Sequence, residues 1–174
     1  MAKQTITITL HTSELVYDVQ NKTYLTGRSR SDGENNEAVA DMQATDDEAN
    51  ANQVMRSIGN ALGALKENLG EYVSDSGTTA SDVLFGGKDK VTVTLSMPGN
   101  FNVAVRDSLA AAMHQYVVNI AVGDWFLITD KADAEGYMTL AAANLVQIKD
   151  ALNRRVRPSR PASASAGTDA AEAM

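Results

Sequence analysis

Four arginines gather near the C-terminus of the chain, at Arg154, Arg155, Arg157 and Arg160. A guanidinium group presents N–H donors in a planar fork that matches the oxygens of phosphate and carboxylate groups. The same arginines follow a predicted helix, whose C-terminal carbonyl groups favour positive charge. The pattern therefore leaves two interpretations open: a contact site for DNA or an acidic protein surface, or a basic helix end.

The histidines do not indicate catalysis. His11 and His114 are the only two in the chain, and the sequence places no recognisable catalytic partner beside either. His114 lies next to the apolar face of a predicted helix, where we interpret it as a core or interface residue. We therefore expect a protein that is not an enzyme and that needs no cofactor.

Two further motifs resemble ligand sites only in part. Asp130, Asp133 and Glu135 lack the glycine and the full ligand series of a calcium-binding loop, so we predict that they cap a helix. Gly86-Gly87-Lys88 lacks the earlier glycine and the following Ser or Thr of a phosphate-binding loop, which favours a simple turn. We expect no bound metal.

The composition narrows the class of protein. The 174 residues include 22 acidic and 15 basic side chains, and the formal charge of −7 argues against a general nucleic-acid binder. The absence of cysteine excludes disulfides, zinc–thiolate sites and thiol catalysis. No apolar run approaches the ~20 residues that span a bilayer, so we expect no membrane partner and synthesis in the cytoplasm.

The stretch 101–153 predicts two helices that would carry the arginines at their end. Apolar residues recur at spacings of three and four from Val105 to Ala121, and Trp125, a predicted core residue, extends the first helix toward Thr129. Asp130 is the predicted N-cap of the second helix, and Asn100 or Asn102 can cap the first. So short a turn makes the two helices antiparallel neighbours.

A third helix is predicted over residues 47–73, with a block of acidic residues before and at its start. Gly59 and Gly63 in this helix predict the close approach of a neighbouring backbone. The acidic block reads as a loop that leads into the helix, and its members are Asp32, Glu34, Glu37, Asp41, Asp46, Asp47 and Glu48.

The strand signals lie in two regions, 1–30 and 88–96. Residues 5–10 alternate threonine with apolar residues at period two, and residues 91–95 repeat the pattern, so the late strand is expected to pair with early ones. Residues 15–19 and 23–26 flank Asn21 and predict a short hairpin.

Together these patterns predict an α+β fold that is mainly α: an antiparallel bundle of three or more helices with a small antiparallel β-sheet and flexible termini. We expect one domain over residues 1–157 and a flexible C-terminal tail over residues 158–174, which is small and polar in composition. The polar stretch Ser74–Asp89 predicts a long loop that contacts partners.

Several segments resemble small structural virion proteins of tailed phages and prophages of Bacteroidetes-type hosts, of the head–tail connector or neck type. The segments are Met97–Phe101, Ser108–Tyr116, Asp124–Asp130, Ala132–Tyr137 and Leu152–Pro158.

This resemblance implies a homo-oligomeric subunit of a ring in the virion, assembled in the host cytoplasm and contacting portal and tail or neck proteins. The arginines would face packaged DNA or an acidic portal surface. An acidic block in one part of the chain and an arginine block in another would suit head-to-tail association of identical subunits. The alternative is a small nucleic-acid-binding regulator that uses the arginine segment Arg154–Arg160 on phosphate.

Overall fold

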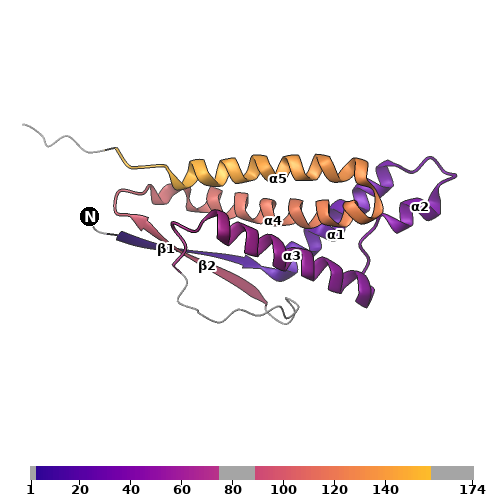
Figure 1. The fold of residues 1–174 in the computed structure, drawn as a ribbon, viewed down its shortest axis with the longest axis horizontal. Helices are drawn as coiled ribbons and strands as arrows, with labels where there is room; N and C mark the ends of the chain where they lie inside the picture. The colour runs from indigo at the N-terminus through magenta and orange to yellow at the C-terminus, as the bar shows by residue number, and fades with distance from the viewer. Residues whose placement is uncertain (1–2, 75–88, 158–174) are drawn as a thin grey trace, which may run out of the picture.

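A computed structural model describes residues 3–74 and 89–157 (Figure 1). In these ranges the fold is α+β and mainly α, as predicted, with a small two-stranded antiparallel sheet. The elements are β1 (Lys3–His11), α1 (Thr12–Ser29), α2 (Asn36–Asp41), α3 (Glu48–Asn68), β2 (Lys90–Pro98), a 3-10 helix (Val103–Val105), α4 (Arg106–Thr129) and α5 (Lys131–Leu152).

The sheet joins the start of the chain to its middle. β1 and β2 pair antiparallel from Lys3 opposite Pro98 to His11 opposite Lys90, which confirms the predicted pairing of late and early strands. Because side chains alternate across a strand, the apolar members of the pattern share one face. The buried set is Ile6, Ile8 and Leu10 on β1 and Val93, Leu95 and Met97 on β2.

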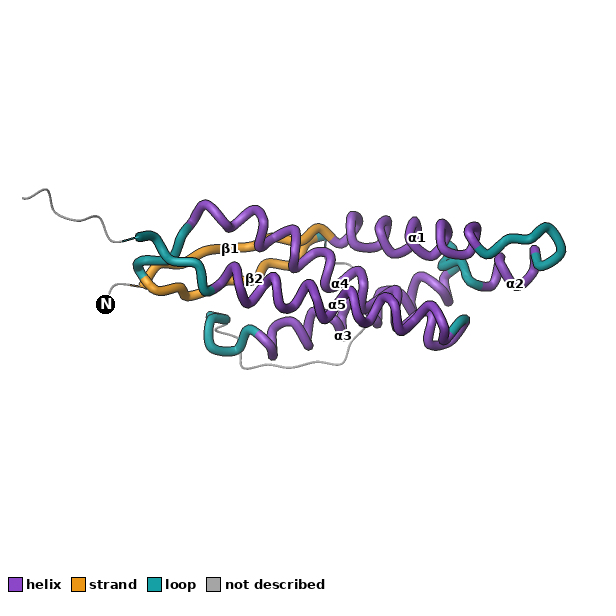
Figure 2. The backbone as a smooth tube through the Cα atoms, turned by 90° about the horizontal axis from the view of Figure 1, so that it is seen from above, coloured by secondary structure: helices purple, strands orange, loops and turns teal. Residues whose placement is uncertain are grey.

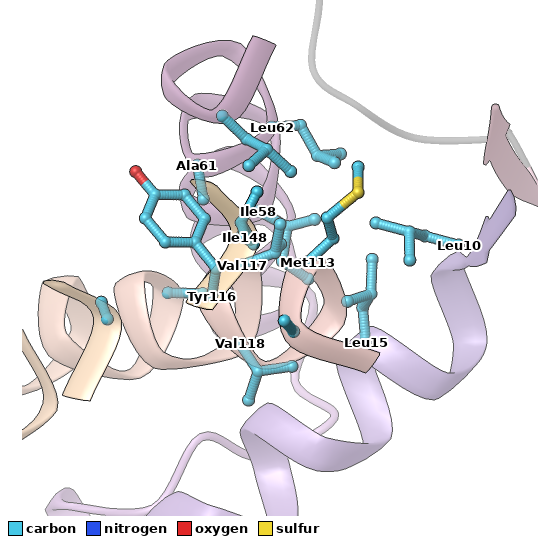
Figure 3. Close-up of a cluster of buried hydrophobic side chains, with 14 of the residues drawn as sticks. Leu10, Leu15, Ile58, Ala61, Leu62, Met113, Tyr116, Val117, Val118 and Ile148 are labelled. Atoms are coloured by element: carbon cyan, nitrogen blue, oxygen red, sulfur yellow. The ribbon is translucent and has the colours of Figure 1, made fainter. Parts of the chain in front are cut away.

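α4 is the central element, and it packs against α5, α3, α1 and β1 (Figures 1 and 2). Figure 3 shows Met113 and Val117 of α4 among Leu15 of α1 and Ile58 and Leu62 of α3. Neighbours on several sides explain why α4 is apolar over most of its circumference, a pattern typical of a buried helix. The predicted core position of Trp125 is confirmed, since its side chain is 7% exposed.

α4 and α5 form an antiparallel hairpin around a single residue. Asp130 ends α4, and its carboxylate accepts a hydrogen bond from the backbone N–H of Ala132 at 3.0 Å, which confirms the predicted N-cap. Asn102 likewise accepts from the N–H of Ala104 at 3.1 Å, but it caps the 3-10 helix, and α4 itself begins at Arg106.

The hairpin predicted around Asn21 is wrong, because α1 runs without interruption through both of its predicted strands. The β-branched and aromatic residues of this segment favour strands in isolation, yet its buried residues are spaced by four: Leu15, Val19, Thr23 and Gly27. That spacing places them on one helical face toward the core, so only residues 3–11 of the predicted β-rich region 1–30 form a strand.

The third helix is shorter than predicted. α3 ends at Asn68, and Tyr72–Ser74 run along the free edge of β2, where Ser74 N–H donates to Thr94 O at 2.9 Å. The predicted close approach at Gly63 is also wrong, since a Cβ there would meet no other atom within 4 Å. Close approaches occur at other glycines: a Cβ at Gly27 would lie 3.1 Å from the backbone oxygen of Val39, and a Cβ at Gly123 would lie 2.8 Å from the side-chain Cε of Met138.

Two predictions fall outside the described residues: the tail 158–174 and, apart from its first and last residues, the loop Ser74–Asp89. Within the described ranges, no helix is both long enough and apolar enough to cross a membrane.

Candidate functional site

The arginine segment is attached to the end of the bundle by backbone pairing. After α5 ends, Asn102 N–H donates to Arg154 O at 3.1 Å and Val156 N–H donates to Asn100 O at 2.8 Å. Phe101, which lies between the two paired residues, is 2% exposed and anchors this connection in the core. The arginines therefore start from a defined backbone at the end of α5.

The side chain of Arg155 forms hydrogen bonds within the fold. Its guanidinium Nη1 donates to Leu152 O at 2.6 Å and to Arg154 O at 3.2 Å, and Leu152 is the last residue of α5. A cation that satisfies a terminal carbonyl group also complements the negative end of the helix dipole. Arg155 therefore contacts the C-terminal end of α5, as expected of a basic helix end.

Arg154 and Arg157 are exposed at the same end of the molecule. Arg154 lines a shallow groove of about 600 Å³ together with Asn102, Ser108 and Asp150, while Arg160 lies outside the described residues. Other basic residues reach this end from elsewhere in the chain: Lys3 begins β1 opposite Pro98, and Arg106 begins α4. We call Lys3, Arg106, Arg154, Arg155 and Arg157 the basic end. Asp107 and Asp150 lie among them, and Glu67, Glu71 and Lys149 line a neighbouring pocket together with Asn153.

The acidic block lies at the opposite end of the elongated molecule, around α2 and the loops beside it (Figures 1 and 2). All of its seven residues, Asp32, Glu34, Glu37, Asp41, Asp46, Asp47 and Glu48, are exposed. We call these seven residues the acidic end. Arg28 and Arg30 are nearby, and Arg30 forms a salt bridge with Asp133 at the start of α5.

Buried contacts hold the acidic end against the bundle. The indole Nε1–H of Trp125 donates to Met42 O at 2.8 Å, and the hydroxyl of Thr23 accepts from the N–H of Ala44 at 3.1 Å. Gly27 permits this approach, because a Cβ there would lie 3.1 Å from Val39 O. The acidic side chains are therefore carried on a backbone that is fixed to α1 and α4.

A polar network crosses the middle of the bundle, and the sequence patterns did not reveal it. Lys22 Nζ of α1 donates to Gln115 Oε1 at 2.9 Å and to Asn119 Oδ1 at 2.7 Å on α4. Asn119, 4% exposed, donates in turn to Asn144 Oδ1 of α5 at 2.8 Å. Burial lowers the pKa of Lys22, and the nearby charge of Asp18 partly opposes that change.

Next to this network, His114 Nε2 lies 2.9 Å from Asp18 Oδ2. The sequence did not reveal this partner, because Asp18 is 96 residues away and was expected in a strand. The three polar residues His114, Gln115 and Asn119 in an apolar helix were the available signal. We interpret the pair as part of the polar seam between α1 and α4, in agreement with the predicted interface role of His114.

The remaining candidates have structural roles or lie elsewhere. Asp130 is an N-cap and Asp133 is paired with Arg30, and the described part of the chain holds no group of three or more His, Asp or Glu residues arranged for a metal ion. Gly86-Gly87-Lys88 lies outside the described residues.

No protein-family model matches the chain, and comparisons with curated proteins and with solved structures find no match either.

Proposed function

We propose that the protein is a non-catalytic structural subunit of a phage virion, a head–tail connector or neck protein whose copies assemble into a ring between portal and tail. The observation that carries the proposal is the separation of charge: the acidic end and the basic end lie at opposite ends of one elongated subunit (Figure 1).

The distance between the ends decides what these charges can do. α4 alone has 24 residues, which corresponds to about 36 Å of helix. Charges that far apart do not interact within one subunit, because the screening length at physiological salt is about 8 Å. Between subunits, in contrast, an acidic end and a basic end attract each other and steer association.

A contact between unlike ends is heterologous, and repetition of such a contact closes into a ring when the rotation between subunits allows it. The rigid α4–α5 hairpin supports this role because it links the two ends directly, from Asp130 at the acidic side to Arg154 at the basic side. The assignment to a virion rests on the resemblance, whose segments cover about half of this hairpin and also lie on its two flanks.

The second candidate, a nucleic-acid-binding regulator, is favoured by one observation: Arg154 and Arg157 are exposed at one end of the fold. The formal charge of −7 argues against nucleic-acid binding, because it repels phosphate groups. Such binding would weaken steeply with salt and would be lost when these arginines are neutralised.

The test compares the full-length chain with the double variant Arg154→Gln/Arg157→Gln. Light scattering over a concentration series, followed by electron microscopy, should show discrete ring-shaped oligomers for the unchanged protein and smaller species for the variant. Arg56→Gln is the matched control, because Arg56 is an exposed arginine in the middle of α3. A monomer at all concentrations, combined with DNA binding that the double variant loses, would favour the regulator.

A further inference from the structure

α5 has an outward face without charge. From Gly136 to Ile148 the sequence contains no Asp, Glu, Lys or Arg, although α5 lies in an outer layer of the bundle (Figure 1). Leu140 and Val146 on its surface are 52% and 60% exposed. We call the exposed residues of this stretch the α5 outer face; they are Gly136, Thr139, Leu140, Ala142, Ala143, Val146 and Gln147.

This face differs from that of α3, which is another long outer helix. The exposed residues of α3 include Glu48, Asn52, Arg56, Asn60 and Glu67, a polar and charged set typical of contact with water. α5 uses its opposite side, with Ala134, Ala141 and Ile148, to pack on α4. Because a helix that is apolar on both sides is normally covered on both sides, the α5 outer face is suited to a partner.

Gly136 supports the same conclusion. It lies inside α5, its backbone does not have positive φ, and a Cβ would meet no other atom within 4 Å. Glycine costs about 1 kcal/mol relative to alanine at such a position. The described fold has no packing reason for this residue, whereas a notch in the surface can receive a side chain from a partner.

The charges that flank the face indicate which partner fits. Glu135 and Lys149 are both exposed, and each lies seven residues from Ala142, in opposite directions along α5. Residues seven apart lie on nearly the same side of a helix. A two-fold axis beside Ala142 would therefore place Glu135 of each copy close to Lys149 of the other, so the two helices are complementary in charge when antiparallel.

We propose that the α5 outer face binds a second copy of this chain, with the two α5 helices antiparallel around a two-fold axis beside Ala142 and Ala143. This pairing rests on the proposed self-association and specifies one of its contacts. It is isologous, whereas the contact between the acidic and basic ends is heterologous, so the two contacts can be present together and join two rings or two neighbouring subunits.

Disulfide trapping tests the pairing directly, because the chain has no cysteine of its own. Ala143→Cys places a thiol next to the proposed axis, within reach of its symmetry mate. Ala132→Cys places thiols about 30 Å apart along the antiparallel helices, from a rise of about 1.5 Å per residue. We expect rapid oxidation of the Ala143→Cys protein to a covalent dimer and none for Ala132→Cys or for the α3 control Asn60→Cys.

A charge exchange tests the register. Glu135→Lys brings two lysines together at each contact, and Lys149→Glu brings two glutamates together, so each variant alone should dimerise roughly tenfold more weakly. An equal mixture of the two variants restores both opposite-charge contacts and should recover dimerisation. Both side chains are exposed, so neither change should disturb folding.

The cross-linking and light-scattering results together distinguish the α5 pairing from the proposed ring contact. If Ala143→Cys cross-links no faster than Asn60→Cys while the protein still forms oligomers, the α5 pairing is overturned and the ring proposal stands. If Ala143→Cys cross-links but Arg154→Gln/Arg157→Gln leaves the mass of the assembly unchanged, the pairing stands and the proposed end-to-end contact fails. Cross-linking at Ala132 and Ala143 alike would indicate parallel helices and would also overturn the proposed arrangement.

Discussion

Arg154 and Arg155 are adjacent in the chain, but their surroundings give them different tasks. Arg155 donates to Leu152 O at the end of α5, whereas Arg154 lines an open groove. Arg155→Ala should therefore lower the free energy of unfolding by about 1–2 kcal/mol, because a charge-assisted hydrogen bond and a favourable dipole interaction are lost. Arg154→Ala should change it by less than about 0.5 kcal/mol. Urea unfolding of both variants measures the difference, and equal losses would contradict the distinction.

Two helical glycines provide a comparison of packing. Gly63 faces open space, so Gly63→Ala should raise the free energy of unfolding by about 0.5–1 kcal/mol through helix propensity. A Cβ at Gly123 would lie 2.8 Å from Cε and 3.1 Å from Sδ of Met138, so the thioether must move. We expect Gly123→Ala to be less stable than Gly63→Ala in thermal or urea unfolding. Equal stabilisation would show that Met138 moves without cost.

Asp124 gives the stability of the protein a pH dependence. Burial raises the pKa of this carboxyl group above its ordinary value of 3.8, and the hydrogen bond from Ser57 lowers it in part. The folded state then binds more protons than the unfolded state just above pH 3.8, so the contribution of Asp124 to stability increases as the pH falls through that range. At neutral pH the ionised carboxylate carries a desolvation cost.

Asp124→Asn removes this ionisation and keeps an acceptor for Ser57. The variant should be more stable than the unchanged protein at neutral pH, and its advantage should shrink as the pH is lowered. Urea unfolding of both proteins between about pH 4 and pH 7 measures this change. Parallel stability curves would contradict the raised pKa.

At the scale of elements, the segment that carries the acidic end depends on a few buried contacts with α4. Trp125→Phe removes the donor to Met42 O and leaves a buried carbonyl group without that hydrogen bond, which should cost about 1–3 kcal/mol. The loss should appear mainly as faster hydrogen exchange around α2. Tyr116→Phe is the control, because it removes a hydroxyl group from another largely buried aromatic residue of α4. Equal exchange in both variants would argue against a specific role of the indole.

At the scale of the whole molecule, two kinds of contact between copies should respond differently to salt. Association through the acidic and basic ends should weaken as salt rises from about 0.05 M to 0.5 M, because the screening length falls to a few ångströms. The α5 pairing buries mostly uncharged surface and should persist. Analytical ultracentrifugation over this range should show large assemblies giving way to dimers. Loss of all association at the same salt concentration would contradict two separate contacts.

The sequence determined the features that depend on neighbours within one or two turns of chain. Alternation over residues 5–10 and 91–95 indicates strands because a strand presents every second side chain to one face, and both strands are confirmed. Asp130 was identifiable as an N-cap because the residue type and the start of the next helix are both local. The antiparallel pairing of α4 and α5 was predicted from the short turn between them, and the structure confirms it.

The tertiary structure decided which competing local pattern prevails and which distant residues meet. The segment 15–26 has strand-forming residues, but burial of Leu15, Val19 and Thr23 against the bundle made it a helix. The partners His114 and Asp18 are 96 residues apart, and the acidic and arginine blocks lie at opposite ends only because of how the helices are arranged. The outward position of the uncharged α5 face was hidden for the same reason: periodicity shows that a helix has faces, but only long-range packing determines which of them is covered.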